Sequence, residues 1–97
     1  MVLYKHSARC PTSDDAYNEV RKFVRARTDV PVYMVDVIGD RPLSQYIAER
    51  TAIVHHSPQV LLVRGGVCHW HASHYYVTAE ALAREVEALG QPGALPA

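Results

Sequence analysis

The chain has 97 residues, of which 48% are hydrophobic and 21% are charged. This length and composition are typical of one globular domain and exclude intrinsic disorder, a collagen-like chain and a coiled-coil rod. Ten basic and ten acidic residues give a formal net charge of +0, so no global field attracts nucleic acid or an anionic membrane. The apolar runs are too short to span a bilayer and no secretory leader is recognisable. We therefore expect a cytoplasmic protein.

The first half of the chain alternates strand and helix patterns. We expect a short buried strand at 2–4, a helix from Pro11, and a second strand over 30–38 that is rich in β-branched residues. A second helix is expected from Pro42, because proline suits the first helical position. The helical face of the first helix consists of Ala16, Tyr17, Val20, Phe23, Val24 and Arg27.

The second half begins with an apolar run and a tight turn. A third strand (59–63) and a returning strand (67–72) flank Gly65-Gly66, a pair that tolerates the positive φ angles of a hairpin turn. A last helix follows, capped at its N-terminus by Thr78 and ending at Gly90. The hairpin thus adds two antiparallel strands to those of the first half.

The expected order of elements is β-α-β-α-β-β-α, with three helices on a mixed four-stranded sheet. Two βα units give parallel strands through right-handed crossovers. This order resembles the minimal thioredoxin or glutaredoxin-like α/β fold. We assign residues 1–90 to that single domain and expect a flexible tail over 91–97, which contains two prolines and a glycine.

The segment Cys10-Pro11-Thr12-Ser13 carries the clearest chemical signal, because it lies between the first strand and the first helix. If Pro11 is the first helical residue, Cys10 is the N-cap, and its sulfur accepts from the backbone N–H of Thr12 or Ser13. These donors and the helix dipole favour the thiolate, and Arg9, Lys5 and His6 could add positive potential, whereas the two aspartates that follow oppose it. An inert, buried capping cysteine is the alternative.

Ser13 occupies the position of the second cysteine in a C-x-x-C redox pair. Serine cannot close a disulfide with Cys10, so the chemistry left open is monothiol exchange, in which a separate thiol resolves the adduct. As an alternative, Ser13 is simply a residue of the first helical turn. We expect Cys68, the other cysteine, to be a small buried hydrophobic residue in the last strand, far from Cys10.

The dipeptide Ser57-Pro58 precedes the third strand. In thioredoxin-like folds a cis-proline at this place faces the cysteine, and the backbone before it pairs with the substrate. We therefore expect a substrate groove between Cys10 and Ser57-Pro58, with His56 in its wall. A solvated loop is an equally good interpretation of His56.

Three histidines near the end of the last strand raise the possibility of a metal site. His69 and His71 would share a face of a strand, and a turn could bring His74 alongside, so three imidazoles could bind zinc. No acidic residue lies within this run. We expect no metal here, and expect His71 and His74 to order the following loop through backbone hydrogen bonds.

Several sequence blocks resemble the monothiol bacilliredoxin family and appear in the same order as in that family. Its members are thioredoxin-like proteins of the bacillithiol system. The similarity extends over about residues 3–89 and rests on residues 5–13, 36–38, 41–44, 47–49, 57–59 and 70–74. The resemblance implies reduction of bacillithiol mixed disulfides on client proteins, with Cys10 as nucleophile. It also implies bacillithiol as co-substrate, no tightly bound cofactor, and S-bacillithiolated clients as partners. We expect a monomer.

The chain departs from the family pattern in three ways. Arg9 replaces the usual threonine and is expected to deepen the thiolate shift or to contact an acidic group of the small thiol. Thr12 replaces the usual isoleucine and is expected to alter substrate preference. The family's additional N-terminal strand and helix do not precede the first strand here, which leaves one sheet edge less protected. Cys68 has no role that the resemblance implies.

Two other functions fit the same residues. One is a binding module that holds an iron–sulfur cluster between two protomers, with the small thiol completing the ligation. The other is an adaptor without redox activity, which an ordinary Cys10 pKa of about 8.5 would favour.

Overall fold

The computed structural model describes residues 1–9 and 11–90, so Cys10 and the tail expected over 91–97 lie outside the described residues. The elements are β1 (Val2–His6), α1 (Ser13–Ala26), β2 (Val32–Asp36), α2 (Arg41–Thr51), β3 (Gln59–Arg64), β4 (Val67–Ser73), the 3₁₀ turn η1 (His74–Tyr76) and α3 (Ala79–Gly90). Apart from η1, this order is the predicted one.

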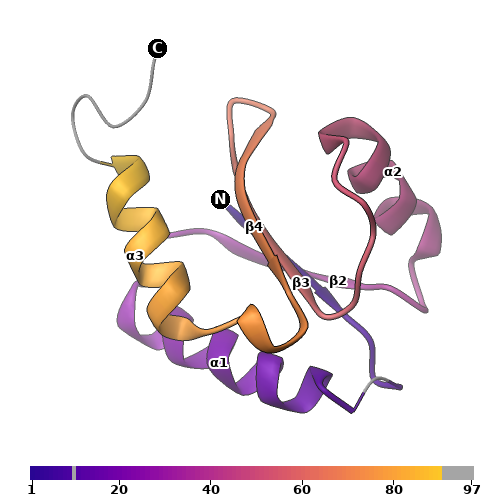
Figure 1. The fold of residues 1–97 in the computed structure, drawn as a ribbon, viewed down its shortest axis with the longest axis horizontal. Coiled ribbons are helices and arrows are strands. Elements are labelled where there is room, and N and C mark those ends of the chain that lie inside the picture. Colours follow the sequence, from indigo (N-terminus) through magenta and orange to yellow (C-terminus); the bar gives the residue numbers. More distant parts are fainter. Residues whose placement is uncertain (10, 91–97) are drawn as a thin grey trace.

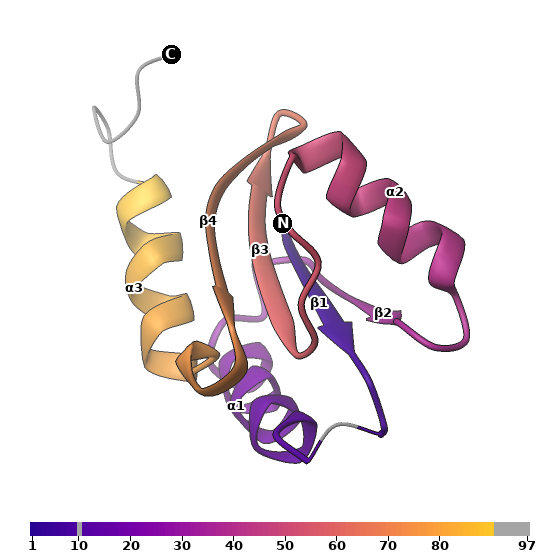
Figure 2. The ribbon, with the colours of Figure 1, turned by 45° about the vertical axis from the view of Figure 1, so that its right-hand side comes forward.

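The four strands form one mixed sheet in the order β2-β1-β3-β4 (Figure 2). β1 is parallel to β2, and β3 is antiparallel to both β1 and β4. Lys5 lies opposite Gln59, and Gln59 lies opposite Ser73. The last residues of β1 and β4 and the first residue of β3 therefore share one end of the sheet, which we call the site end. The cysteine motif follows β1, and Ser57-Pro58 precedes β3, so the chain leads from both segments to this end.

Helices cover both faces of the sheet, with α1 and α3 on one face and α2 on the other (Figure 1). The larger core lies under α1 and α3 and includes Tyr4, Phe23 and Leu82, each almost fully buried. Burial of one such side chain stabilises the fold by about 1.5–3 kcal/mol. The smaller core lies under α2 and consists of Val35, Ile47, Leu61 and Val63. The two cores hold the helices against the two faces of the sheet, and this packing positions the segments at the site end.

The start of α1 differs from the prediction. The helix begins at Ser13, with Thr12 as N-cap, because the carbonyl of Thr12 accepts the first helical hydrogen bond, from Ala16 N–H at 3.2 Å. Pro11 and Thr12 form a turn before the helix. The prediction that Pro11 is the first helical residue and Cys10 the N-cap is therefore wrong by two residues.

Two strand boundaries also differ. β1 extends through Lys5 and His6, because both pair with β2 in a regular parallel register. β2 is shorter than predicted, because the carboxylate of Asp36 accepts the N–H groups of Ile38 and Gly39 and turns the chain there.

Helix faces and turns are largely as expected. Ala16, Val20 and Phe23 are buried, whereas Tyr17 and Val24 flank them and remain 38% and 42% exposed. The hairpin turn is confirmed by positive φ angles at both glycines, 61° and 77°. Among the described residues, no helix combines the length and apolarity that a membrane crossing requires.

Candidate functional site

A buried tyrosine connects the end of β1 to the start of α1. The hydroxyl of Tyr4 lies 2.7 Å from Nδ1 of His6 and donates to the carbonyl of Ser13 at 3.4 Å. The imidazole of His6 then contacts the ring of Tyr17 on α1, with centroids 5.5 Å apart. These contacts fix both chain segments that flank the cysteine motif, whereas Arg9 and Pro11 themselves are exposed.

Ser13 places a buried hydroxyl within the motif. The residue is 1% exposed, and its Oγ has no hydrogen-bond partner among the described residues. A buried hydroxyl without a partner costs about 1–3 kcal/mol, so native structures normally satisfy such a group. Ser13 thus offers a hydrogen-bond donor three residues after Cys10. The sequence pattern identified Ser13 by its place in the motif, but not the burial of its hydroxyl.

The predicted groove segment lies at the site end. The Ser57-Pro58 peptide bond is cis, as predicted, and Pro58 is fully buried. The carbonyl of Pro58 accepts the N–H of His74 at 2.9 Å, which joins this segment to η1. His56 is exposed, and its ring meets that of His74 edge-on at 5.4 Å. The structure therefore brings Ser57, Pro58 and His56 together with His74, whose backbone orders the loop as expected.

Lys5, which the sequence suggested as a source of positive potential, lies at the site end, but the sequence predicted neither its burial nor its partners. It is fully buried, and its Nζ donates to the carbonyl of Ser44 at 3.0 Å and lies 3.1 Å from Nδ1 of His55. No ion pair within residues 1–9 and 11–90 includes Lys5. Burial lowers the pKa of this amine below its ordinary value. The strand period of two is the signal that could have placed Lys5 inside, because it puts Lys5 on the same face as Leu3, which packs against the core under α2.

The contact between Lys5 and His55 determines the state of the imidazole. An ammonium group has only donors, so when Lys5 is protonated Nδ1 of His55 accepts and the imidazole is neutral. The hydroxyl of Ser44 also lies within hydrogen-bonding distance of this nitrogen, at 3.2 Å. Burial, followed by the positive charge of Lys5, lowers the pKa of His55. The two groups connect β1, α2 and the loop before Ser57 at the site end.

Cys68 lies toward the opposite end of the sheet. It pairs with Val63 of β3 and packs, half-buried, against the core under α2. Its Sγ donates to the carbonyl of Trp70 at 3.3 Å. Burial raises the pKa of this thiol, so the reactive thiolate is disfavoured. The prediction of a small apolar residue is close, although the side chain is less buried than expected.

The three histidines near the end of β4 do not converge. An irregularity in the pairing of β3 with β4 leaves His69 between the paired residues Cys68 and Trp70, so His69 and His71 do not alternate regularly along one face. The imidazole of His69 lies 3.3 Å from the carbonyl of Arg64 instead. Within the described part of the chain, no three His, Cys, Asp or Glu side chains form a group that could hold a metal ion.

Comparison with known proteins identifies the family. The family model for the monothiol bacilliredoxin BrxC matches residues 1–82. This chain belongs to the monothiol bacilliredoxin family. The sequence blocks named above therefore indicated the right family. Membership of this family implies a thiol-redox function in general.

Solved structures agree on the fold of this bacilliredoxin. A protein described as a candidate oxidoreductase with a thioredoxin fold is 36% identical, with a TM-score of 0.79 over 86% of this chain and 73% of that one. Thioredoxin f2 of Chlamydomonas reinhardtii is 18% identical, with a TM-score of 0.71 over 94% of this chain and 79% of that one. Thioredoxin 1 of Thermosipho africanus is 14% identical, with a TM-score of 0.67 over 93% and 98% of the two chains. The last two show the thioredoxin fold alone.

Proposed function

We propose that this bacilliredoxin exchanges bacillithiol mixed disulfides on client proteins through Cys10 alone. The observation that carries the proposal is the state of the other thiol. Cys68 is half-buried, has a raised pKa and lies toward the sheet end opposite the motif, so it is poorly suited to be the nucleophile. Cys10, in the family motif, is the remaining cysteine of the two in the chain.

The exchange proceeds in two balanced steps. The Cys10 thiolate attacks the bacillithiol sulfur of a client mixed disulfide, that disulfide breaks, and the client thiolate leaves and takes a proton from water. A second bacillithiol thiolate then attacks the bacillithiol sulfur held on Cys10. Bacillithiol disulfide leaves and the Cys10 thiolate is regenerated. The client thiol is thus reduced while one free bacillithiol is oxidised and joins the bacillithiol from the mixed disulfide in bacillithiol disulfide.

Side chains of the motif support the thiolate in this mechanism. α1 begins at Ser13, so Cys10 is not its N-cap. We therefore assign to the buried hydroxyl of Ser13 the donor role that the sequence analysis gave to the backbone N–H of Thr12 or Ser13. The guanidinium of Arg9 adds positive potential, and Pro11 and Thr12 shape the turn between them. A hydrogen bond to a charged acceptor is stronger than one between neutral groups, so Ser13 favours the thiolate over the thiol.

The client would lie along Ser57-Pro58, next to the exposed ring of His56. We further propose that the protein works in the cytoplasm as a monomer. It would need no tightly bound cofactor, because bacillithiol is a co-substrate that enters and leaves. S-bacillithiolated proteins would then be its partners.

Substitution of each cysteine tests the assignment. Cys10→Ser should abolish release of bacillithiol from a bacillithiolated client, because serine cannot form the mixed disulfide. Cys68→Ser should leave turnover within about twofold of the parent, since this thiol is disfavoured as a nucleophile. Turnover measured by intact mass of the client separates these cases. Turnover that survives in Cys10→Ser would refute the mechanism, and an anaerobically purified brown dimer would favour the cluster-binding module.

A further inference from the structure

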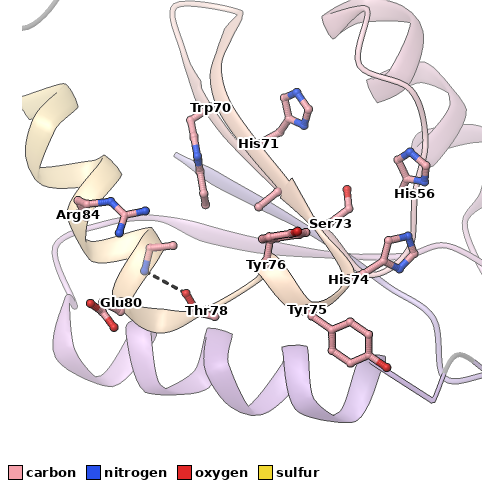
Figure 3. A pocket seen from close by; sticks show the side chains of 12 residues that line it. His56, Trp70, His71, Ser73, His74, Tyr75, Tyr76, Thr78, Glu80 and Arg84 are labelled. Carbon is pink, nitrogen blue, oxygen red and sulfur yellow. Dashed lines mark hydrogen bonds between the residues drawn. The ribbon is translucent and has the colours of Figure 1, made fainter.

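A cavity of about 700 Å³ opens beside the site end, between the outer edge of β4, the turn η1 and the first half of α3 (Figure 3). We call it the β4–α3 pocket. His56 and His74 form the part next to Pro58, and Trp70, Tyr76 and Arg84 form the part toward α3. Its size falls within the range of about 300–1,000 Å³ that is usual for small-molecule sites.

The pocket is fixed in position relative to the cis-proline. The N–H of His74 donates to the carbonyl of Pro58 at 2.9 Å, and the carbonyl of His74 accepts the N–H of Val77 at 3.3 Å. His74 has a φ of 56°, a left-handed conformation that is unfavourable for a residue with a side chain. These two hydrogen bonds and the left-handed backbone of His74 hold η1 at the junction of the pocket and the proposed client groove.

Aromatic rings form much of the pocket surface. Tyr76 is 79% exposed, and Trp70 is only partly buried against the core. In Figure 3 the Trp70 ring lies between β4 and α3, and the Tyr76 ring lies in front of the end of β4; both line the pocket. Flat aromatic surfaces with a few polar groups suit a ring-shaped ligand that must also be oriented.

Arg84 supplies a positive charge to the same surface. Its guanidinium extends from α3 toward Trp70 in Figure 3. Its ion-pair partner among the described residues is Glu85, whose carboxylate lies 3.6 Å from Nε, and the Arg84 side chain remains 64% exposed. The two terminal nitrogens are therefore accessible to a ligand. Glu80 of α3 also lines the pocket and would repel an anion near its own carboxylate. A guanidinium binds a carboxylate through two parallel hydrogen bonds, so the part of the pocket at Arg84 favours a carboxylate-bearing group.

From this chemistry we infer that the β4–α3 pocket holds the part of bacillithiol that lies beyond its cysteine, an inference that rests on the proposed function. That part is an aminosugar ring that carries malate, so it presents a ring and two carboxylates. The sugar would pack against Tyr76 and Trp70, and a malate carboxylate would pair with Arg84. The cysteine end would then point past His74 and Pro58 toward the motif. Bacillithiol would be selected over smaller thiols by contacts remote from sulfur.

Binding without reaction provides the first test. S-methyl bacillithiol cannot form a disulfide, and Trp70 is the only tryptophan of the chain, so its fluorescence reports on the pocket directly. We expect a saturable change, with affinity reduced about five- to tenfold in Arg84→Gln and in Tyr76→Ala. Arg25→Gln, an exposed arginine on α1 away from this pocket, should bind as the parent does. The absence of a saturable change in the parent would overturn the inference, and leaves the reactivity of Cys10 to be judged separately.

Reaction rates distinguish failure of the pocket from failure of the proposed function. We would compare bacillithiol disulfide with cystine, which shares the disulfide between two cysteines but has no sugar or malate and carries a free carboxylate in place of each amide to the sugar. Arg84→Gln should slow adduct formation with bacillithiol disulfide about five- to tenfold and change the rate with cystine less than about twofold. An equal loss of rate with both disulfides in Arg84→Gln would overturn the inference. A loss of rate that appears only with a bacillithiolated peptide would also overturn it, because the pocket would then bind the client. A parent protein that reacts with neither disulfide would instead refute the proposed function.

Discussion

At the scale of single residues, the hydroxyl of Ser13 is expected to control the acidity of Cys10. Ser13→Ala should raise the pKa of Cys10 by about one unit, because a hydrogen bond to a charged group is worth about 1.5–3 kcal/mol and one pKa unit corresponds to about 1.4 kcal/mol. The pH dependence of alkylation by iodoacetamide measures this pKa. Ser44→Ala, which removes a buried serine hydroxyl that lies 3.2 Å from Nδ1 of His55, is the matched control.

The stability of Ser13→Ala separates this role from a structural one. At a pH below the pKa of Cys10, where its thiol is protonated, removal of a buried hydroxyl that has no partner among the described residues should leave the free energy of unfolding unchanged or raise it. If the variant were less stable and the Cys10 pKa were unaltered, Ser13 would serve the fold rather than the thiolate.

His55 gives the second residue-scale prediction, which concerns pH. Its pKa in the folded protein is lowered, so just below the ordinary value of about 6.5 the unfolded chain binds more protons than the folded one. The free energy of unfolding should therefore rise with pH in the window between the lowered pKa and the ordinary value. The stability that neutral His55 contributes is fully present above the ordinary value. Urea midpoints on either side of the window should differ less in His55→Gln than in the parent. An unchanged difference would contradict the assignment of a neutral imidazole to His55 in the folded protein.

At the scale of elements, two side chains cap the start of α3: Thr78, and Glu19 of α1, whose carboxylate accepts the N–H of Ala79 at 3.1 Å. The hydroxyl of Thr78 accepts the N–H of Ala81 at 3.1 Å, as the sequence predicted. Thr78→Ala should lower the free energy of unfolding by about 1 kcal/mol, or the melting temperature by about 4–8 °C. Thr78→Ser should retain most of the stability because it keeps the oxygen. Equal melting temperatures for Thr78→Ala and the parent would show that the cap contributes nothing.

The elements that the sequence predicted well are those with a strong local pattern. Helical periodicity located α1 and α3, and Gly65-Gly66 located the hairpin. The start of α1 was misplaced because proline suits a pre-helical turn as well as a first helical turn, and only the carbonyl contact of Thr12 distinguishes them. The turn η1 was missed because three residues are too short to show any period.

At the scale of the whole molecule, the sequence predicted the topology but not the neighbours of the site. Lys5 and His55 are 50 positions apart, and the β4–α3 pocket combines His56 with Arg84. Such contacts follow from strand register and helix packing, which no local pattern encodes. Family resemblance supplied the motif and the cis-proline segment. The buried amine and the shape of the pocket required the folded chain.

The central claim is that a single cysteine carries the bacillithiol adduct. The most direct measurement is the intact mass of the reduced protein after reaction with bacillithiol disulfide, followed by peptide mapping. We predict one adduct, on Cys10, that excess bacillithiol removes. An adduct on Cys68, or none on Cys10, would contradict the mechanism.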